Sequence, residues 1–539
     1  MRSLDVAATR TYHAAGLWTR HTWGERLQAW ASRSPDRLAA ADSSRRLTRR
    51  EYAGEVAALA DGLVSCETLP GQRVGLLSGN CIDYAVARLA ISEIGAVTVP
   101  ISVALGDADI RHLVDMAGVR VLIGPTRWGE REMLVPLITN PPGSVEVIVS
   151  FDDPAPPGLL SVADLIELGR KHPRSGAAVV DTRPDPDTLD ILSATSGTTQ
   201  GVTKLVARTQ NQYYSLERQI LSRHGITEHD RLLGMAPITQ AIGSNPIYAN
   251  LLYGSSYVEM QRFSAAEALT RIESEGITYL VSVPTHLVDL LDAIEEGSYD
   301  LSGLRVVYSA GAAISPDVAR DIERLTGATF LSAYGAVDAG VGSGSGLDDP
   351  AEERFTTAGR TFVGDEVLVT DPDGHPVGVG EIGEFRLRGA SGSLGYWADE
   401  EADKAVFDEA GYARTGDLGT IGPDGLLRII DRSKDIIIRG GQNIVPAEIE
   451  RLLIAHPAVH HASIVAVPDR RLGERCCAFI VPKGSAPSLD ELRTYLRAEG
   501  LATYKLPEHV EIVRELPMSP GGKVSKATLR ATLRDRLQR

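Results

Sequence analysis

Short apolar segments alternate with amphipathic segments between about residues 73 and 335. The apolar segments read RVGLLSG, AVTVPIS and VRVLIG, and later RLLGMAP, TYLVSVP, LRVVYSAG and ATFLSAYG. Segments with apolar residues at helical spacing, such as DYAVARLAISEIG, lie between them. Strands that are apolar on both faces and are joined through helices form parallel sheets. The alternation therefore predicts an α/β fold with doubly wound sheets, in which ligands bind at the carboxyl ends of the strands.

The pattern changes twice towards the C-terminus. From about residue 355, the segments EVLVTDPDG, GEIGEFRLRG and GLLRIIDRSKD contain turn signals typical of hairpins, which predict an antiparallel β subdomain. From residue 435 on, strand and helix patterns mix in a segment large enough to be a domain. A chain of 539 residues exceeds what a single core supports. We therefore expect a large N-terminal domain, which includes the antiparallel subdomain, and a small α+β C-terminal domain.

Charge and cysteine content exclude several classes of function. The formal net charge of -16 argues against nucleic acid or an anionic membrane as the main partner. The four cysteines and twelve histidines show neither a disulfide framework nor a metal-ligand spacing, and none is assigned to chemistry. The N-terminus lacks the apolar core of a signal peptide, and no apolar run reaches transmembrane length. We expect a cytoplasmic protein.

The stretch SATSGTTQGVTK, at residues 193–204, has the composition of a phosphate-binding loop. It follows an apolar run and contains hydroxyl residues, two glycines and Lys204. Backbone N–H groups and hydroxyls of such a loop can turn towards an anion, and a lysine adds a point charge. The spacing is not that of nucleoside triphosphatase P-loops. By itself the loop fits a polar surface turn as well as a phosphate site.

Five motifs together carry a resemblance to a known family. TSGTTQGVTK, AYGAVD, YARTGDLG, DRSKDIIIRGGQNIVPAEIE and PMSPGGKVSK occur in this order. They resemble the motifs of the adenylate-forming superfamily of acyl-CoA synthetases, peptide-synthetase adenylation domains and luciferases. The segments GLWTRHTWGERL and LATYKLPEHVEIVRELPMSPGGKVSK are most similar to stand-alone aryl-acid AMP ligases, such as 2,3-dihydroxybenzoate-AMP ligase.

The resemblance implies a reaction in two steps. A carboxylate attacks the α-phosphate of ATP to give an acyl adenylate and pyrophosphate. The thiol of CoA, or of a carrier-protein phosphopantetheine, then displaces AMP. The resemblance thus implies ATP and Mg²⁺ as cofactors and an aromatic acid as substrate. Because the first step joins two anions, the site needs cations and oriented donors more than a general base.

The family motifs assign ATP contacts and catalytic residues by position. Lys523 matches the lysine that bridges carboxylate and phosphate oxygens, while Lys526 nearby is expected to be solvated. Tyr334 matches the aromatic residue stacked on adenine, and Asp417 the carboxylate that holds both ribose hydroxyls. The implied nucleotide-binding residues are Ser196, Gly197, Thr198, Thr199, Gly201, Lys204, Gly311, Ala312, Tyr334, Gly335, Asp417 and Arg432, of which Lys204 is also placed with Lys523 as catalytic.

The resemblance also implies a moving domain. Residues 431–434 resemble the family hinge, and Lys434 matches the hinge position itself. The expected division is therefore a core over 1–431, a hinge over 432–434 and a small mobile domain over 435–539. Gly440 and Gly441, in RGGQN, match the loop that approaches the thiol acceptor after rotation.

This chain departs from the family at three places. Gln200 stands between TSGTT and Gly201, which lengthens the loop or shifts its hydroxyls. Asp338 replaces the glutamate that ligates magnesium, and a carboxylate remains suited to this ion. In ITQAIGSNP, a histidine and asparagine of aryl-acid ligases are replaced, so an ordinary 2-hydroxybenzoate is not expected as the substrate. The expected pocket residues are Gln240, Ala241, Ser244 and Asn245.

Two other functions remain open at this point. The scaffold could adenylate a non-carboxylate, such as nitrite with an aryl amine in a diazotase reaction, because fold does not fix function. The altered loop and Asp338 could also mark a binding protein with reduced catalysis. Lys204, Asp417, Lys434 and Lys523 argue against this last reading.

Overall fold

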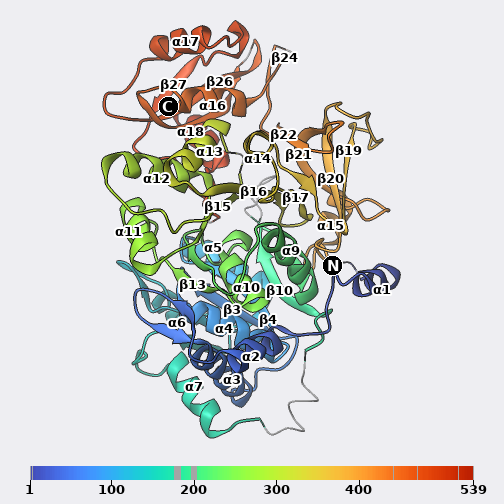
Figure 1. Ribbon diagram of the computed structural model, residues 1–539, viewed down its shortest axis with the longest axis vertical. Helices are drawn as coiled ribbons and strands as arrows, with labels where there is room; N and C mark the ends of the chain where they lie inside the picture. The colour runs from blue at the N-terminus through green and yellow to red at the C-terminus, as the bar shows by residue number, and fades with distance from the viewer. Residues whose placement is uncertain are drawn as a thin grey trace.

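The computed structural model describes residues 2, 4–174, 184–195, 203–312, 314–440, 442–469, 471–519 and 521–537 (Figure 1). Two large sheets, one antiparallel sheet and a separate C-terminal sheet organise these residues. The α/β fold with an antiparallel subdomain, predicted from the alternation of segments, is confirmed. Within the described ranges, every helix is too short or too polar to span a membrane.

The first large sheet contains the early apolar segments. Its order is β11-β10-β4-β3-β5-β8-β9, and only the β10–β11 pair is antiparallel. The strands are β3 (Arg73–Ser78), β4 (Val97–Ser102), β5 (Val119–Gly124), β8 (Val147–Ser150), β9 (Leu160–Ser161), β10 (Leu189–Ala194) and β11 (Leu205–Thr209). Strand β10 leads directly into the predicted phosphate loop.

The second large sheet contains the later apolar segments. Its order is β18-β17-β16-β15-β14-β12-β13-β1-β2, with a parallel centre from β1 to β16. The strands are β1 (Leu38–Ala41), β2 (Arg46–Thr48), β12 (Arg231–Gly234), β13 (Ser256–Glu259), β14 (Tyr279–Ser282), β15 (Val306–Ala310), β16 (Thr329–Ala336), β17 (Gly340–Gly344) and β18 (Arg360–Thr361). The carboxyl ends of β15 and β16 carry Gly311 and Tyr334.

One apolar core joins the two sheets. It contains side chains of β3 and β5 from one sheet and of β13, β14 and β16 from the other. The helices that fill the space between are α2 (Trp23–Arg33), α3 (Arg49–Ser65), α4 (Ile82–Glu93), α9 (Gln210–Arg223) and α10 (Ala241–Tyr253). Helix α3 begins with a capping box, in which Thr48 and Glu51 satisfy each other's backbone N–H groups.

Other helices cover the outer faces. The second sheet is covered by α11 (Ala265–Glu275), α12 (Pro284–Glu296) and α13 (Pro316–Thr326), and the first by α5 (Asp107–Ala117) and α6 (Val135–Thr139). The remaining elements of this region are α1 (Val6–Ala14), α7 (Val162–Lys171), α14 (Ala351–Thr356), α15 (Glu400–Val406) and the β6–β7 pair (Arg127–Trp128, Arg131–Glu132). Both parallel sheets are thus covered on both faces, as their apolar strands require.

The antiparallel subdomain follows the parallel sheets. Its strands are β19 (Asp365–Thr370), β20 (Gly383–Gly389), β21 (Ala413–Ile421) and β22 (Leu427–Arg432), in sequential order. In the register of β21 and β22, Asp417 stands opposite Arg432. The hairpin prediction is confirmed, and it places two predicted nucleotide contacts side by side.

The C-terminal residues form a separate sheet with its own core, at the top of Figure 1. The order is β24-β23-β26-β25, with β27 beside β26. One face is covered by α16 and α17, the other by α18. The elements are β23 (Ile437–Arg439), β24 (Gln442–Ile444), α16 (Pro446–Ile454), β25 (Val459–Asp469), β26 (Gly473–Pro482), α17 (Leu489–Ala498), the 3₁₀ turn η1 (Thr503–Lys505), β27 (His509–Ile512) and α18 (Lys526–Leu537).

A buried ion pair fixes the strand before the phosphate loop. Asp190 of β10 pairs with Arg88 of α4, and each side chain is 3% exposed. Ser92 also donates to Asp190, and Gln210 Nε2 donates to Ser92 Oγ at 3.1 Å. Removing one partner of such a pair leaves a buried charge uncompensated, at a cost of about 3–5 kcal/mol. This network therefore holds β10 against α4 and α9.

A second buried acid has no charged partner of this kind. Glu217 of α9 is 1% exposed, and Asn245 of α10 donates to its Oε2 at 2.7 Å. Burial raises the pKa of Glu217 to about 8, although the hydrogen bond from Asn245 opposes the rise. The carboxyl group is therefore largely protonated at neutral pH in the folded chain.

Glu217 should make stability fall as the pH rises. The unfolded chain ionises this carboxyl near its ordinary pKa of about 4.3, whereas the folded chain holds the proton up to about pH 8. Between these values each pH unit costs up to about 1.4 kcal/mol. We expect Glu217→Gln to raise the free energy of unfolding by about 2–4 kcal/mol at pH 7.5 and by little at pH 5. Urea unfolding at both pH values measures this.

The matched control is Glu401→Gln, because the Glu401 side chain is 86% exposed. It should change stability little at either pH. A Glu217→Gln effect of equal size at pH 5 and pH 7.5 would contradict the assigned protonation.

Candidate active site

Tyr334 and Asp417 meet between the second large sheet and the antiparallel subdomain. Tyr334, at the carboxyl end of β16, is 7% exposed, and its hydroxyl donates to Asp417 Oδ2 at 2.9 Å. Burial, and then the Asp417 charge, raise the pKa of Tyr334 far above its ordinary value. Two residues that the motifs assign to adenine and ribose therefore lie in contact, although 83 residues separate them in the chain.

Arg432 completes this group from the last residue of β22. Its Nε donates to the other oxygen of Asp417, Oδ1, at 2.8 Å, and its Nη2 to the carbonyl of Thr415 at 3.3 Å. Both carboxylate oxygens of Asp417 are thus paired, and its side chain keeps a fixed orientation. The arrangement presents a tyrosine, a carboxylate and a guanidinium in a row.

Lys523 reaches the same place from the C-terminal unit. The turn that holds it is closed by the Ser519 N–H to the Lys523 carbonyl at 2.6 Å, and Gly522 has a φ of +73° that favours glycine. Lys523 Cε is so near Gly311 that a Cβ on this glycine would lie 3.3 Å away. The turn thus carries a cation to the carboxyl end of β15, beside exposed Gly311 and Ala312.

The surroundings of Lys523 lower its pKa. Desolvation is the largest cause, Arg432 adds repulsion, and Asp417 partly compensates. Solvent still reaches the Lys523 side chain, although the surrounding protein partly desolvates it. Among the described residues, no carboxylate forms an ion pair with Lys523. A cation held in this way attracts an anion.

Lys204 and Asp338 are linked through Tyr396, which the sequence did not single out. Lys204 Nζ lies 5.0 Å from the centre of the Tyr396 ring, and the Tyr396 hydroxyl donates to Asp338 Oδ2 at 2.5 Å. Asp338 Oδ1 has no hydrogen-bond partner within the described part of the chain. A half-buried carboxylate with one oxygen available fits the oxygen ligands that Mg²⁺ prefers. Tyr396 lies outside every motif, so only the fold could reveal it.

The predicted pocket residues lie at the start of α10. Gln240 precedes the helix, and a Cβ on Gly521 would lie 3.5 Å from its Oε1, so Gln240 borders the turn that holds Lys523. Ala241 and Ser244 are half-buried, and Ser244 Oγ donates to the Ala241 carbonyl at 2.9 Å. Asn245 is 1% exposed; its amide contacts Glu217 and its Oδ1 has no hydrogen-bond partner. The four side chains therefore run from the Lys523 turn into the core.

Lys434 and Gly440 lie where the chain leaves the antiparallel subdomain. Lys434 stands between β22 and β23, and desolvation, followed by repulsion from Arg432, lowers its pKa to about 8. Gly440 has a φ of +57° in the turn between β23 and β24, and its N–H donates to the Leu472 carbonyl at 2.7 Å. In Figure 1 the label of β24 stands at the upper edge of the C-terminal unit.

Gly335 has a packing reason to be glycine. It faces Val341 across β16 and β17, and a Cβ there would lie 2.4 Å from the Gly340 carbonyl oxygen. Its predicted role at the nucleotide stays a prediction. Ser196, Gly197, Thr198, Thr199, Gly201 and Gly441, with Gln200, lie outside the described residues.

One side chain differs from what the sequence suggested, and two others make a contact that the sequence did not indicate. Lys526, expected to be solvated, forms an ion pair with Glu450 at 2.8 Å, and its side chain is only 18% exposed. The histidines, to which no chemistry was assigned, include the neighbours His460 and His461, whose rings meet Asp289 of α12. Neither contact has a sequence signal, because each depends on how the C-terminal unit packs.

The chain matches two family models and has relatives over nearly its whole length. Residues 27–397 match the model of the AMP-binding enzyme, and residues 448–523 that of the AMP-binding enzyme C-terminal domain. Pyochelin synthase PchD of Pseudomonas aeruginosa (strain UCBPP-PA14) is 32% identical over 99% of this chain and 96% of the relative. The 2,3-dihydroxybenzoate-AMP ligase of Bacillus subtilis (strain 168) is 31% identical over 98% and 96%.

A solved structure agrees with this assignment. ATP-bound MatB from Rhodopseudomonas palustris superposes with a TM-score of 0.82 at 25% identity, over 96% of this chain and 100% of that chain. The first family model alone spans more than half of the 539 residues. The chain therefore belongs to the AMP-binding enzyme family, the adenylate-forming ligases that its motifs resemble.

Proposed function

We propose that this protein activates an aromatic carboxylic acid with ATP and then transfers the acyl group to a thiol. In the first step a carboxylate oxygen attacks the α-phosphorus, the bond to the β-phosphate oxygen breaks, and pyrophosphate leaves. In the second step a thiol sulfur attacks the acyl carbon, AMP leaves, and the thiol proton passes to solvent. The acceptor is the phosphopantetheine of a carrier protein, or CoA, in a natural-product or siderophore pathway.

The convergence of Lys523, Arg432, Asp417 and Tyr334 carries this proposal. Tyr334 offers a ring surface for adenine, and the Asp417 carboxylate offers acceptors for ribose hydroxyls. Lys523 and Arg432 supply the positive charge that two approaching anions require. Opposite charges in a partly desolvated site interact more strongly than in water. The relative that ligates 2,3-dihydroxybenzoate to AMP supports a carboxylate over nitrite as the activated group.

Lys204 and Asp338 supply the phosphate side of the proposed site. Lys204 lies half-buried just after the predicted loop and contacts the Tyr396 ring, which Asp338 orients from the other side. Mg²⁺ held by Asp338 would neutralise part of the triphosphate charge. Lys204 would bind phosphate oxygens as a point charge.

We further infer that residues 435–539 rotate about a hinge at 432–434. The separate apolar clusters of the C-terminal sheet support a unit that can move as one body. In the present arrangement it delivers Lys523 to Gly311, which suits the adenylation step. Gly440 would take its place when the thiol enters.

Removing Lys523 should abolish the first half-reaction selectively. We expect Lys523→Ala to lower ATP–pyrophosphate exchange by roughly 10²–10³-fold, as for loss of one oxyanion donor. Transfer from a preformed acyl adenylate should persist. The control Lys526→Ala removes a neighbouring cation whose partner is Glu450, and it should retain exchange. Exchange near wild type in Lys523→Ala would refute the assigned role.

Restricting the hinge should impair the second half-reaction and spare the first. Proline fixes φ and lacks an N–H, so it restricts the backbone rotation that a hinge at this position would need. We expect Lys434→Pro to retain exchange while thioester formation falls at least about tenfold, since each 1.4 kcal/mol of added barrier costs a factor of ten. Lys434→Ala separates loss of charge from loss of rotation. Equal loss of both half-reactions in Lys434→Pro would contradict the hinge.

Gln240 should set the preference for a polar substituent. Its place beside the Gly521 turn puts it near the reacting end of the acid, while Ala241 offers no hydrogen bond. We expect an amino-substituted or otherwise modified aryl or arylacrylic acid, whose polar group reaches Gln240, to be preferred. We expect 2,3-dihydroxybenzoate to gain little from its 2-hydroxyl. Gln240→Leu should lower kcat/KM about tenfold more for the substituted acid than for benzoate.

An exchange screen across aryl acids, with nitrite plus an aryl amine as a separate arm, measures this preference. Ser244→Ala is the control, because the Ser244 hydroxyl bonds within α10. A preference of several hundredfold for 2,3-dihydroxybenzoate or salicylate would show that Ala241 lies outside the pocket. Turnover in the nitrite arm alone would replace the carboxylate as substrate.

A further inference from the structure

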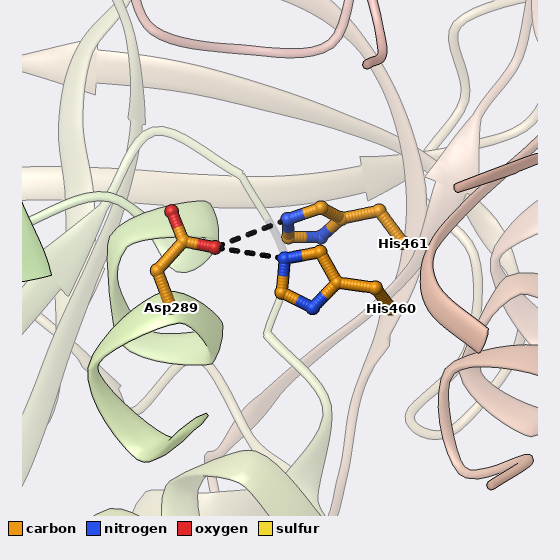
Figure 2. Close-up of side chains that lie close together, drawn as sticks. All are labelled: Asp289, His460 and His461. Atoms are coloured by element: carbon orange, nitrogen blue, oxygen red, sulfur yellow. Dashed lines mark hydrogen bonds and ion pairs between the residues drawn. The ribbon is translucent and has the colours of Figure 1, made fainter. Parts of the chain in front are cut away.

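Two neighbouring histidines of β25 meet one carboxylate of α12. His460 Nε2 and His461 Nε2 each lie 3.2 Å from Asp289 Oδ1. Figure 2 shows both imidazole rings directed at the same oxygen, with Asp289 on its helix and the histidines on the opposite strand. All three residues are half-buried. The group joins the C-terminal unit to α12 of the rest of the chain.

A second carboxylate stands behind one of the imidazoles. His460 Nδ1 lies 2.9 Å from Asp292 Oδ2, and Lys483 Nζ lies 2.8 Å from Asp292 Oδ1. Without an ion, His460 Nε2 donates to Asp289; with an ion bound, Asp292 would hold the proton on Nδ1 and Nε2 would be available as a ligand. Metal-bound histidines commonly have a carboxylate in this position, which fixes the tautomer and raises ligand basicity.

The spacing of the three facing atoms suits a tetrahedral ion. Zinc binds imidazole nitrogen and carboxylate oxygen at about 2.0–2.2 Å, which places neighbouring ligand atoms about 3.4 Å apart in a tetrahedron. The two measured separations are 3.2 Å, and all three ligand atoms lie within 4.8 Å of one another. A small adjustment of the imidazoles would admit the ion.

We propose that Asp289, His460 and His461 form a binding site for a zinc-like divalent transition-metal ion, with water as the fourth ligand. Two imidazoles and a carboxylate select such ions over Mg²⁺ or Ca²⁺, which prefer oxygen ligands. Asp292 positions His460 without touching the metal.

Another acidic group with a histidine provides a contrast. Asp371, Asp373 and His375 also lie within ligand distance of one another, in the exposed turn before β20. Asp371 is engaged with the turn itself, since its Oδ1 accepts the His375 N–H at 2.9 Å. We therefore use this group as a control for zinc binding.

A bound ion would fasten the C-terminal unit to α12. This consequence rests on the proposed function, because only a rotating unit can be arrested. The fastened arrangement is the one in which Lys523 lies beside Gly311. Zinc should therefore leave adenylate formation intact and slow transfer to the thiol.

The first experiment measures metal binding alone. Full-length protein, stripped with a chelator, is titrated with Zn²⁺ against a chromophoric chelator at about pH 8, which is above the ordinary imidazole pKa of about 6.5. We expect one site, weakened at least tenfold in Asp289→Asn and in His461→Ala. Asp292→Asn should weaken it about 10–100-fold, as for loss of a carboxylate behind a ligand. His375→Ala should bind as wild type does.

Circular dichroism verifies that each variant folds, and the visible spectrum of the Co²⁺ form reports the ligand geometry. A tetrahedral Co²⁺ spectrum that disappears in Asp289→Asn supports the site. Zinc affinity unchanged in all three variants, or an octahedral Co²⁺ spectrum, would overturn it.

The second experiment separates the site from its effect on the reaction. Transfer from preformed acyl adenylate is measured with and without Zn²⁺ in wild type and Asp289→Asn, so that binding of zinc by the thiol cancels in the comparison. We expect at least tenfold inhibition in wild type only. Binding without this difference would overturn the arrest of the C-terminal unit. Absence of any adenylation in wild type would instead refute the proposed function and leave the binding result standing.

Discussion

The Asp417 carboxylate is the contact on which the geometry of the site depends. One oxygen accepts from Tyr334 at the end of β16, and the other from Arg432 at the end of β22. Tyr334 belongs to the parallel sheet, whereas Arg432 begins the connection to the C-terminal unit. A single side chain therefore ties the nucleotide side of the site to the predicted hinge. Because Arg432 and Tyr334 bind the two oxygens of one carboxylate, a shift of Arg432 that moves Asp417 also disturbs the hydrogen bond from Tyr334.

The sequence predicted the fold well where local patterns and physical requirements agree. The apolar runs ending at Gly311 and Tyr334 became adjacent parallel strands, because they bury both faces and need helices between them. Thr48 and Glu51 formed the capping box that their spacing indicates. The P-D-G and D-G turns formed an antiparallel sheet in which Asp417 faces Arg432. In each case the information lies within a few residues or repeats with a regular period.

Contacts between distant segments could not be predicted in the same way. Tyr396 bridges Lys204 and Asp338 although no motif contains it. Asp289 contacts His460 and His461, and 172 residues separate Asp289 from His461 in the chain. The residues next to Lys526 in the sequence suggest a solvated position, but Lys526 forms an ion pair with Glu450. Motif matching identified Lys523, yet only the structure places its side chain beside Gly311. The contacts of these residues depend on how distant segments pack together, and the residues next to them in the sequence give no signal of these contacts.

Several ion pairs connect the C-terminal unit to the rest of the chain, and this bears on how the unit can move. His460 and His461 meet Asp289, Lys483 meets Asp292, and the Lys523 turn lies against Gly311. The apolar side chains of this unit are instead gathered in its own clusters. An interface of this kind can separate without exposing a core, because water replaces its hydrogen bonds and ion pairs at small net cost. In the rotation that we propose, these ion pairs would break and the Lys523 side chain would leave Gly311.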